Sequence, residues 1–354
     1  MRLDEELEVI ERIGPLDEAA MQAARARQAT LTKPAGSLGR LENLATQIAG
    51  ITGKARPSMA RKALFVMAGD HGVVAEGVSA YPQQVTPQMV ANILNGGAAI
   101  NALAQHVGAS VRVVDVGVAF PLPTHPALIS RRIANGTANI ARGPAMTRQQ
   151  AVAAIRVGVE VFEAQLAQGL DLVGTGDMGI GNTTPSSAIA TVLTGEMPAC
   201  LVGKGTGVDQ SGLARKCLVV ERALSVNQPN PHDGLDVLAK VGGYEIGAIA
   251  GLILGAAANR CPVLIDGFIS TAGAMIAVTL APQVQPYLIA AHLSDERGHR
   301  AMLNWLGLDP LLDLNMRLGE GTGAALAMSL ADAACKLLSE MATFAEAGVA
   351  GKEA

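Results

Sequence analysis

One acid in this sequence stands alone between glycines, in a setting that could support acid–base chemistry. Glu320 lies in the segment RLGEGTG at residues 317–323, directly before an apolar segment with helical spacing. The flanking glycines permit unusual backbone angles and carry no side chains that would shield the carboxylate, which could therefore project into a cleft. The local sequence leaves one alternative open, in which Glu320 is an acid stabilised by the dipole at a helix N-terminus.

Polar, glycine-rich segments follow most of the predicted strands and form a second group of candidates. In an open parallel sheet, ligands bind in a crevice outside the carboxyl ends of the strands. Any one of these segments could be an ordinary strand-to-helix turn, but together they predict a single binding crevice. They are GDHG at residues 69–72, DVG at 115–117, GTGD at 174–177, GKGTG at 203–207, DG at 266–267 and HLS at 292–294.

Two of these segments could bind a phosphate group. Glycines at residues 174–176 and 203–207 would let backbone N–H groups approach an anion closely, and Lys204 and Lys216 could add positive charge. The spacing that ends in Gly-Lys-Ser/Thr is absent, so the sequence does not indicate ATP hydrolysis by a P-loop enzyme.

A dinucleotide-binding motif is the competing interpretation of the first of them. Residues 174–179 match G-x-G-x-x-G, and Glu196 lies near the distance expected of a ribose-binding acid. However, Asp177 would place a carboxylate inside the pyrophosphate cradle. The next helix is also expected to begin only at Thr184 and Pro185, a pair typical of an N-cap and a first turn. We therefore do not expect a nicotinamide cofactor.

Acids and histidines also suggest a metal site, but their spacing fits one poorly. Asp70 and His71 are adjacent, and residues 292–299 contain His292, Asp295, Glu296 and His299. A glycine lies between those two histidines, and the sequence has no H-E-x-x-H motif. The sequence predicts neither a metal nor an organic cofactor.

Short apolar segments of strand length recur along the chain and would position these residues. Continuous rather than alternating apolarity indicates strands that are buried on both faces. Helix-length segments at residues 87–107 and 147–168 separate them, which predicts an α/β fold with a parallel sheet of about six strands, flanked by helices. The predicted strands are residues 63–67, 111–116, 170–173, 200–202, 263–265 and 287–290.

The two ends of the chain predict a separate helical unit. Residues 17–31 and 38–51 carry helical periodicity, and a similar apolar stripe recurs over residues 326–344. We expect a small helical domain from residues 1–60 and 326–354, beside a large α/β domain at 61–325 that carries the active site.

Composition limits the class of protein. Of the 354 residues, 49% are hydrophobic and only 3% aromatic, with 40 glycines, which is typical of closely packed α/β layers. The net charge of −4 provides no broad basic surface, so nucleic acid is not an expected partner. The four cysteines form no C-x-x-C pair, which argues against a zinc knuckle or a disulfide framework and favours a reducing compartment.

Export and membrane insertion are not expected either. The N-terminal residues are acidic and lack an apolar signal segment, which predicts a cytoplasmic location. The most apolar stretch, residues 246–280, is interrupted by polar and charged residues before it reaches the roughly 20 residues that a membrane span requires. A buried helix followed by a buried strand is the expected structure there.

Several motifs follow one another along the chain: KPAGSLGRLE at residues 33–42, AGDHGV at 68–73, GNTTP at 181–185, NQPNP at 227–231, KVGG at 240–243, DGF at 266–268 and MRLGEG at 316–321. In this order they resemble the nicotinate-nucleotide:dimethylbenzimidazole phosphoribosyltransferase family, over residues 31–344. The resemblance implies transfer of the 5-phosphoribosyl group of nicotinate mononucleotide to 5,6-dimethylbenzimidazole, giving α-ribazole 5′-phosphate and nicotinate for the lower ligand of cobalamin. It further implies a Rossmann-like sheet, a helical domain drawn from both termini, and a homodimer.

The resemblance also implies roles for individual residues. The family's catalytic base matches Glu320, so the resemblance favours a catalytic role for this residue over a purely structural one. A second family acid, usually glutamate, falls at Asp177, one methylene shorter, where it would stabilise the charge on the ribose or position it. The glycines around Asp177, including Gly176 and Gly179, would help to hold the phosphate. Further substrate-binding positions are Gly205, Thr206, Gly207, Lys216 and Ser294 near the phosphate, Met178 and Leu318 against the base, and Ser79, Tyr81 and Gln83 in a base-pocket loop.

Two other functions remain open from the sequence. A related phosphoribosyltransferase or nucleosidase could use the same crevice on another base, since Tyr81 fits either a stacking residue or an exposed turn. A non-catalytic nucleotide-binding sensor is the other alternative, but such a protein would have no need of Glu320 together with the glycine-rich segments.

Overall fold

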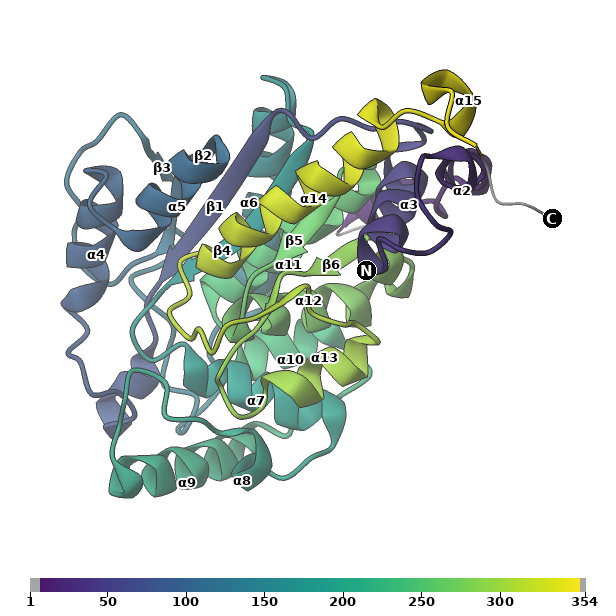
Figure 1. Ribbon diagram of the computed structural model, residues 1–354. Coiled ribbons are helices and arrows are strands. Elements are labelled where there is room, and N and C mark those ends of the chain that lie inside the picture. The colour runs from purple at the N-terminus through teal and green to yellow at the C-terminus, as the bar shows by residue number, and fades with distance from the viewer. Residues whose placement is uncertain (1–6, 351–354) are drawn as a thin grey trace.

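A six-stranded parallel sheet forms the centre of the structure, a computed structural model that describes residues 7–350 (Figure 1). The strand order is β3-β2-β1-β4-β5-β6, with the reversal of strand order between β1 and β4 that is typical of a Rossmann fold. The predicted fold class is therefore confirmed. The strands are β1 (Lys62–Gly69), β2 (Ala109–Gly117), β3 (Leu128–Ser130), β4 (Leu172–Met178), β5 (Val263–Ile265) and β6 (Leu288–Ala290).

The continuous apolar sequence of β1 follows from burial on both faces of the sheet. Phe65 and Met67 point into one apolar layer, whereas Leu64 and Val66 point into the other, and all four side chains are 0% exposed. Successive side chains of a strand alternate between faces, so a strand covered on both sides has no polar alternation.

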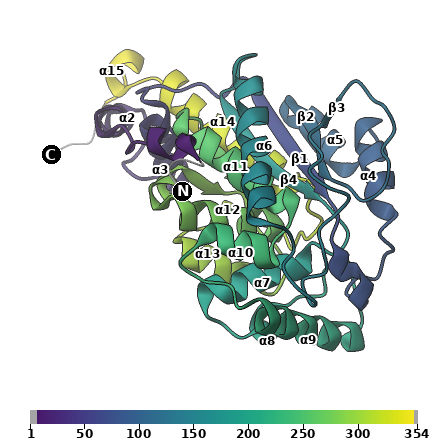
Figure 2. The ribbon, with the colours of Figure 1, turned by 180° about the vertical axis from the view of Figure 1, so that it is seen from behind.

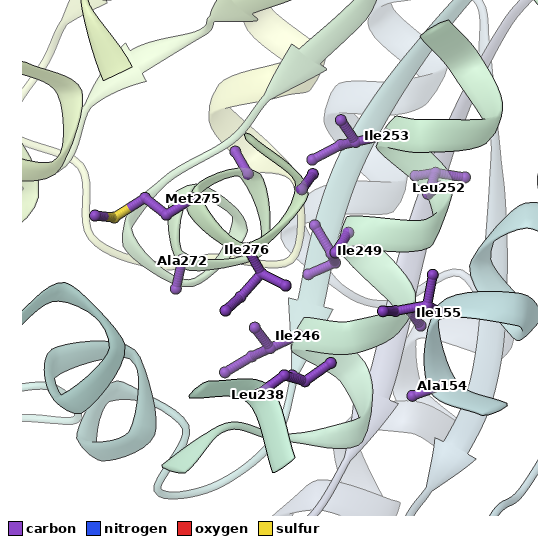
Figure 3. Close-up of a cluster of buried hydrophobic side chains, with 14 of the residues drawn as sticks. Ala154, Ile155, Leu238, Ile246, Ile249, Leu252, Ile253, Ala272, Met275 and Ile276 are labelled. Atoms are coloured by element: carbon purple, nitrogen blue, oxygen red, sulfur yellow. The ribbon is translucent and has the colours of Figure 1, made fainter. Parts of the chain in front are cut away.

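Three helices cover one face of the sheet: α6 (Arg148–Leu166), α11 (Tyr244–Ala258) and α12 (Phe268–Leu280) (Figure 2). Figure 3 shows Ile249 of α11 on the side toward Ile276 of α12, and Leu252 on the side toward Ile155 of α6. The helices α6 and α11 approach backbone to backbone, because a Cβ on Gly251 would lie 1.8 Å from the carbonyl oxygen of Ile155. Glycine here lets α11 lie against α6.

The other face is covered by α4 (Val85–Leu94), α5 (Ala99–Val107), α3 (Arg40–Thr52) and α14 (Thr322–Glu340) (Figure 1). The single helix predicted over residues 87–107 is wrong in one respect. Residues 95–98 interrupt it, and Gly96 takes a left-handed φ of 80° that ends α4. The interruption gives α5 an N-terminus of its own.

Three other predictions of secondary structure need correction. The segment at residues 200–202 is not a strand, because Pro198 begins the short helix α8 (Pro198–Leu201), where a first-turn proline is favourable. The missing sixth strand is β3, which is only partly buried and lies at the sheet edge. Residues 246–280 form a helix, a strand and a second helix rather than a helix and a strand.

The strand β4 is longer than predicted and continues to Met178. Gly174 and Gly176 therefore lie within the strand, where they pair with Leu64 and Val66 of β1. The prediction that residues 174–176 form a glycine-rich loop, whether for a phosphate or for a dinucleotide, is wrong because their backbone belongs to the sheet. The following helix, α7 (Thr183–Thr194), begins close to the expected position.

The N-terminal helices pack with the C-terminal helix, as expected. Arg27 of α2 (Glu18–Thr30) donates hydrogen bonds to the carbonyl oxygens of Leu338 at 2.7 Å and Met341 at 3.0 Å. A β-bridge joins Leu31 to Thr343 just before α15 (Phe344–Ala347). The division into two domains at residues 60 and 325 stays a prediction, since α14 also packs on the sheet.

The remaining elements are short helices, longer connections between strands and a second small sheet. The connection from β4 to β5 contains five helices, and a small parallel pair, β7 with β8, follows β6. Among residues 7–350, no helix has the length and apolar character needed to cross a membrane. These elements are α9 (Gln210–Asn227), α10 (Gly234–Val241), α13 (His299–Leu306), β7 (His292–Leu293), β8 (Leu312–Asp313), and the short helices η1 (Glu8–Arg12), η2 (Gly72–Glu76) and η3 (Pro282–Tyr287).

Candidate active site

A cavity of about 260 Å³ lies at the carboxyl ends of β4 and β5, next to the point where the strand order reverses. This is the place where an open parallel sheet binds its ligands. Six of the predicted site residues line it together: Tyr81, Asp177, Gly205, Thr206, Ser294 and Leu318. Several other lining residues were given no substrate-binding role from the sequence, although most of them lie in its motifs: Asn182, Thr183, Phe268, Ile269, His292 and Arg317.

Glu320 lies beside this cavity on a strained loop. Gly319, Glu320 and Gly321 have φ values of 84°, 61° and 92°, so a non-glycine residue stands in the left-handed region between two glycines. Such a residue costs about 1–3 kcal/mol and persists only where its surroundings determine its conformation. Strain of this kind clusters at functional sites, which supports a role for Glu320 in the chemistry.

The close approach of β4 leaves little room for this loop to relax. A Cβ on Gly176 would lie 2.6 Å from the carbonyl oxygen of Glu320. Glycine at residue 176 is thus explained by packing against the Glu320 backbone.

The Glu320 carboxylate is buried and held by the N-terminus of α5. The side chain is 5% exposed, and the N–H of Ile100 donates a hydrogen bond to its Oε2 over 3.4 Å. Burial raises the pKa of Glu320, the Ile100 hydrogen bond opposes this, and the charge of Asp266 raises the pKa further. A carboxyl group with a raised pKa is a better proton acceptor near neutral pH than an exposed one.

Asp177 provides a second buried acid, at the end of β4. It is 7% exposed, and its Oδ2 accepts a hydrogen bond from the Asn182 side chain at 2.9 Å. Burial raises the pKa of Asp177 well above its usual range, and the charges of Asp266 and Glu245 add to this effect. Two acids with raised pKa values therefore adjoin one cavity, which favours a ligand that brings positive charge.

A buried cation, Lys216, lies beneath a glycine-rich loop whose Gly205 and Thr206 line the cavity. Lys216 is 0% exposed and donates hydrogen bonds to Thr183 Oγ1 at 2.8 Å and to the carbonyl oxygen of Gly203 at 3.0 Å. Burial lowers the pKa of Lys216 to about 8, although the charge of Glu296 opposes this. The loop follows α8 rather than a strand, yet Gly205, with φ of 53°, still covers the ammonium group. This arrangement favours an anion.

The predicted base-pocket loop is joined to the same glycine-rich loop by Thr206. Its hydroxyl lies 3.2 Å from Ser79 Oγ and accepts a hydrogen bond from the Ala80 N–H at 3.1 Å. Beside it, Tyr81 and Leu318 are 54% and 58% exposed, although both line the cavity. The two loops thus form one rim.

Other predicted residues, Glu320 and Lys216 among them, lie outside the cavity lining. Gln83 donates to the carbonyl oxygen of His71 at 3.3 Å, and Met178 packs against the apolar layer of the sheet. A Cβ on Gly179 would lie 2.1 Å from the Gly69 carbonyl oxygen, so this glycine permits contact between two strand ends. Gly207, with φ of 103°, lies in the loop that contains Thr206.

Comparison with known proteins agrees with this geometry. A family model described as phosphoribosyltransferase matches residues 13–349. The nicotinate-nucleotide–dimethylbenzimidazole phosphoribosyltransferase of Roseiflexus sp. strain RS-1 is 63% identical over 345 residues, 98% of each chain. The chain belongs to this family. It is a phosphoribosyltransferase, an enzyme that transfers a pentosyl group, and the resemblance read from the ordered motifs is confirmed.

Other members of the nicotinate-nucleotide–dimethylbenzimidazole phosphoribosyltransferase family extend the similarity to structure. The Chloroflexus aggregans enzyme is 62% identical over 346 residues, 98% of each chain. A crystal structure of the Thermus thermophilus enzyme is 48% identical, with a TM-score of 0.90, over 95% of this chain and 100% of its own. A second crystal structure, of CobT from Thermus thermophilus, gives a TM-score of 0.91 at 50% identity, over 94% of this chain and 100% of its own.

The residues that raised the metal hypothesis have other partners in this member of the family. Asp70 accepts hydrogen bonds from Thr86 Oγ1 at 2.7 Å and from the Ala119 N–H at 2.8 Å. His71 Nε2 lies 2.7 Å from Glu245 Oε1, with both side chains at most 1% exposed. Over the described part of the chain, no group of three or more His, Cys, Asp or Glu side chains could hold a metal ion.

Two buried histidines near the cavity differ in their surroundings. His299 Nδ1 accepts a hydrogen bond from the Ser294 N–H at 2.8 Å, and its Nε2 lies 2.8 Å from Thr271 Oγ1, so the neutral ring fixes Ser294. Burial lowers the pKa of His299 to about 3, in agreement with that neutral form. His292 lines the cavity and lies 3.8 Å from Asp266 Oδ1.

Asp266 is the site residue that sequence reasoning placed at a strand exit without giving it a role. Its carboxylate contacts the N-terminus of α14 beside Glu320. The sequence signal for Asp266 was the DG pair after a short apolar segment. The contact between Asp266 and Gly321, however, exists only in the folded chain.

Proposed function

We propose that this enzyme transfers the 5-phosphoribosyl group of nicotinate mononucleotide to 5,6-dimethylbenzimidazole with inversion at the anomeric carbon, which gives α-ribazole 5′-phosphate and nicotinate. The product would serve the synthesis of the cobalamin lower ligand. The observation that carries the proposal is a cavity lined by Gly319, next to the strained, buried acid Glu320, and by Gly205, which lies over buried Lys216.

The leaving group in this reaction needs no acid. The bond between the anomeric carbon and the pyridinium nitrogen breaks, and its electron pair stays on the nitrogen, so nicotinate departs with a neutral ring nitrogen. Positive charge develops on the ribose meanwhile. A nearby ionised Asp177 would stabilise this charge, and the cationic nucleotide would in turn favour the ionised form of Asp177.

Glu320 is assigned as the general base for the acceptor. One benzimidazole nitrogen attacks the anomeric carbon from the face opposite nicotinate, and the other ring nitrogen loses its proton to the Glu320 carboxylate. The raised pKa of Glu320, due to burial and the charge of Asp266, suits proton transfer near neutral pH.

The glycine-rich end is assigned to the 5′-phosphate. Lys216, the Gly205 to Gly207 loop with Thr206, and Ser294 supply a cation, backbone N–H groups and hydroxyls, which together fit a phosphate. The charged phosphate would raise the pKa of Lys216 from about 8 and keep it protonated.

Tyr81 and Leu318 would flank the acceptor base, with Ser79, Gln83 and Met178 supporting the pocket. A homodimer and a cytoplasmic location are further proposals that rest on the family resemblance and the composition.

The test is turnover with both substrates in the absence of added metal, followed by mass-resolved chromatography of nicotinate and α-ribazole phosphate. Wild type should form both products, and Glu320→Gln should be slower by about 100-fold or more, since general bases commonly contribute on that order. Glu196→Gln, at an exposed acid outside the cavity, is the matched control and should retain activity.

Each other outcome has a distinct meaning. Nicotinate release without a ribosylated base would indicate a nucleosidase, and product with a purine alone would change the acceptor. Product formation at the wild-type rate by Glu320→Gln would keep the reaction but remove Glu320 as its base.

A further inference from the structure

We propose that Asp266 is a positioning residue for this reaction: it fixes the strained Glu320 loop and places a negative charge beside the Glu320 carboxylate. The inference rests on the proposed role of Glu320 as the base. Asp266 directly follows β5 and is 1% exposed. Burial of a carboxylate costs free energy unless the group is hydrogen-bonded or paired, so the partners of Asp266 indicate its role.

The first support is how both carboxylate oxygens of Asp266 are used. Oδ2 accepts a hydrogen bond from the Gly321 N–H at 3.1 Å, and Oδ1 accepts one from the Ala324 N–H at 3.0 Å. The first N–H groups of a helix have no partner within it, and Gly321 at the N-cap has no side chain to serve them. Asp266, which follows β5, supplies acceptors for these N–H groups, the first of which belongs to the residue directly after Glu320.

The second support is that Asp266 is itself anchored to the sheet. Its N–H donates to Thr175 Oγ1 at 3.0 Å, and that hydroxyl donates to the carbonyl oxygen of Leu264 at 3.3 Å. Thr175 is 0% exposed and lies in β4, next to Gly176. A connected path thus runs from β4 through Asp266 to the backbone that carries Glu320.

The third support is electrostatic. The charged groups that act on Glu320 are Asp177 at the end of β4 and Asp266 after β5, while α5 contributes the N–H of Ile100. His292 of β7 lies 3.8 Å from Asp266 Oδ1. After burial, the charge of Asp266 is the main influence that raises the pKa of Glu320. Asp266 therefore affects both the position and the basicity of the base.

Asp266→Asn separates this role from a merely structural one. In the amide an NH₂ donor replaces one of the two oxygens and would face one of the two N–H groups, so one hydrogen bond is lost and the loop should shift. We expect kcat to fall by about 10- to 100-fold, as small displacements of a reacting group can cause. KM for nicotinate mononucleotide should not change, because Lys216 and the loop at residues 203–207 belong to other elements. Loss of the negative charge should move the acid limb of the kcat profile to lower pH.

The matched control is Asp115→Asn. Asp115 is also a buried acid at a strand end, 2% exposed, and its Oδ1 accepts the Val118 N–H at 2.9 Å. It contacts neither Glu320 nor α14 in any hydrogen bond of the described residues. This variant should lose stability without a change in the pH profile.

A second pair of variants covers the case in which Asp266→Asn does not fold. Thr175→Val removes the hydroxyl that holds Asp266 and should lower kcat, whereas Thr175→Ser retains it and should restore kcat. The pKa of Glu320 itself can be followed by 13C NMR of the labelled carboxyl carbon, assigned by its loss in Glu320→Gln.

The outcomes distinguish the inference from the proposed function. Wild type that forms no ribosylated base refutes the function, while the NMR midpoint still tests Asp266. A kcat of Asp266→Asn equal to that of wild type, a Glu320 midpoint that does not move to lower pH, or equal activity of Thr175→Val and Thr175→Ser would overturn the positioning role.

Discussion

Glu320 and Lys216 are buried ionisable residues next to residues that line one cavity, and burial shifts the pKa of each toward its neutral form. The pKa of Glu320 is raised and that of Lys216 is lowered to about 8. A nucleotide with a cationic pyridinium at one end and a phosphate at the other would reverse both shifts. The proposed substrate would thus bring the two charges that ionise the carboxyl group of Glu320 and the amine of Lys216.

Lys216→Met tests the anionic end. Removal of a buried, hydrogen-bonded cation should raise the Kd for nicotinate mononucleotide by about 10- to 100-fold. For wild type, binding should weaken as pH rises through about 8, because the lowered pKa leaves Lys216 neutral above that value. Calorimetric titration at pH 7 and pH 9 measures both effects.

Lys204→Met is the matched control, since Lys204 is exposed on the same loop. It should change affinity much less than Lys216→Met. Equal losses in the two variants would contradict the assignment of Lys216 to the phosphate.

At the scale of elements, Gly174 and Gly176 of β4 have different structural roles. A Cβ on Gly176 would meet the Glu320 carbonyl oxygen at 2.6 Å, whereas one on Gly174 would meet the Leu64 side chain at the same distance. Backbone cannot move aside as easily as the end of a side chain. Residue 176 therefore affects the position of the Glu320 loop, whereas residue 174 affects side-chain packing.

Gly176→Ala should displace the Glu320 loop and reduce kcat by about 10-fold or more. Gly174→Ala should instead cost about 1–3 kcal/mol of stability through overpacking, with kcat retained. Steady-state kinetics and denaturant unfolding of both variants check the contrast. Full activity of Gly176→Ala would show that the loop can relax.

The parallel sheet was predictable from sequence where the physical signal was local. Burial on both faces produced the continuous apolar segments of β1, β2, β4 and β5. The strand β3 gave no such signal because it is short and partly exposed, and residues 200–202 gave a false one because Pro198 directs a helix. Tertiary packing also extended β4 through glycines that resemble a loop.

The candidate site was predictable to a lesser degree. Glu320 and Asp177 could be selected because their neighbours are unusual in sequence. The part played by Asp266 depends on contacts with Gly321 and Ala324, which only the folded chain brings together. The N–H of Ile100 carries no sequence signal at all, since any residue at the start of α5 would supply it.

At the scale of the whole molecule, the buried acids near the sheet edge should cost stability. The pKa of Asp177 is well above its ordinary value of 3.8 because of burial and the charges of Asp266 and Glu245. Below that ordinary value both the folded and the unfolded chain are protonated, and no cost arises. As pH rises above it, the unfolded chain ionises first, so the folded state loses stability.

Asp177→Asn should therefore raise the melting temperature, and the increase should be larger at pH 7 than at pH 4, while activity falls. Asp171→Asn is the control, because the pKa of Asp171 is shifted in the opposite direction to that of Asp177. Burial acts to raise the pKa of Asp171, but hydrogen bonds and the charge of Arg61 outweigh burial and lower it. That variant should lower the melting temperature at pH 7. A melting temperature of Asp177→Asn that is independent of pH would contradict the account.

The hydrogen bond from Ile100 to Glu320 spans 220 positions in the chain. A folding intermediate could therefore complete the sheet and its phosphate loop before α14 docks, and such a species would capture the nucleotide without turning it over. Binding would report that the sheet and the loop at residues 203–207 have formed, whereas catalysis would report that α5 and the Glu320 loop have met. Comparing the recovery of the two signals during refolding would time the last step of assembly.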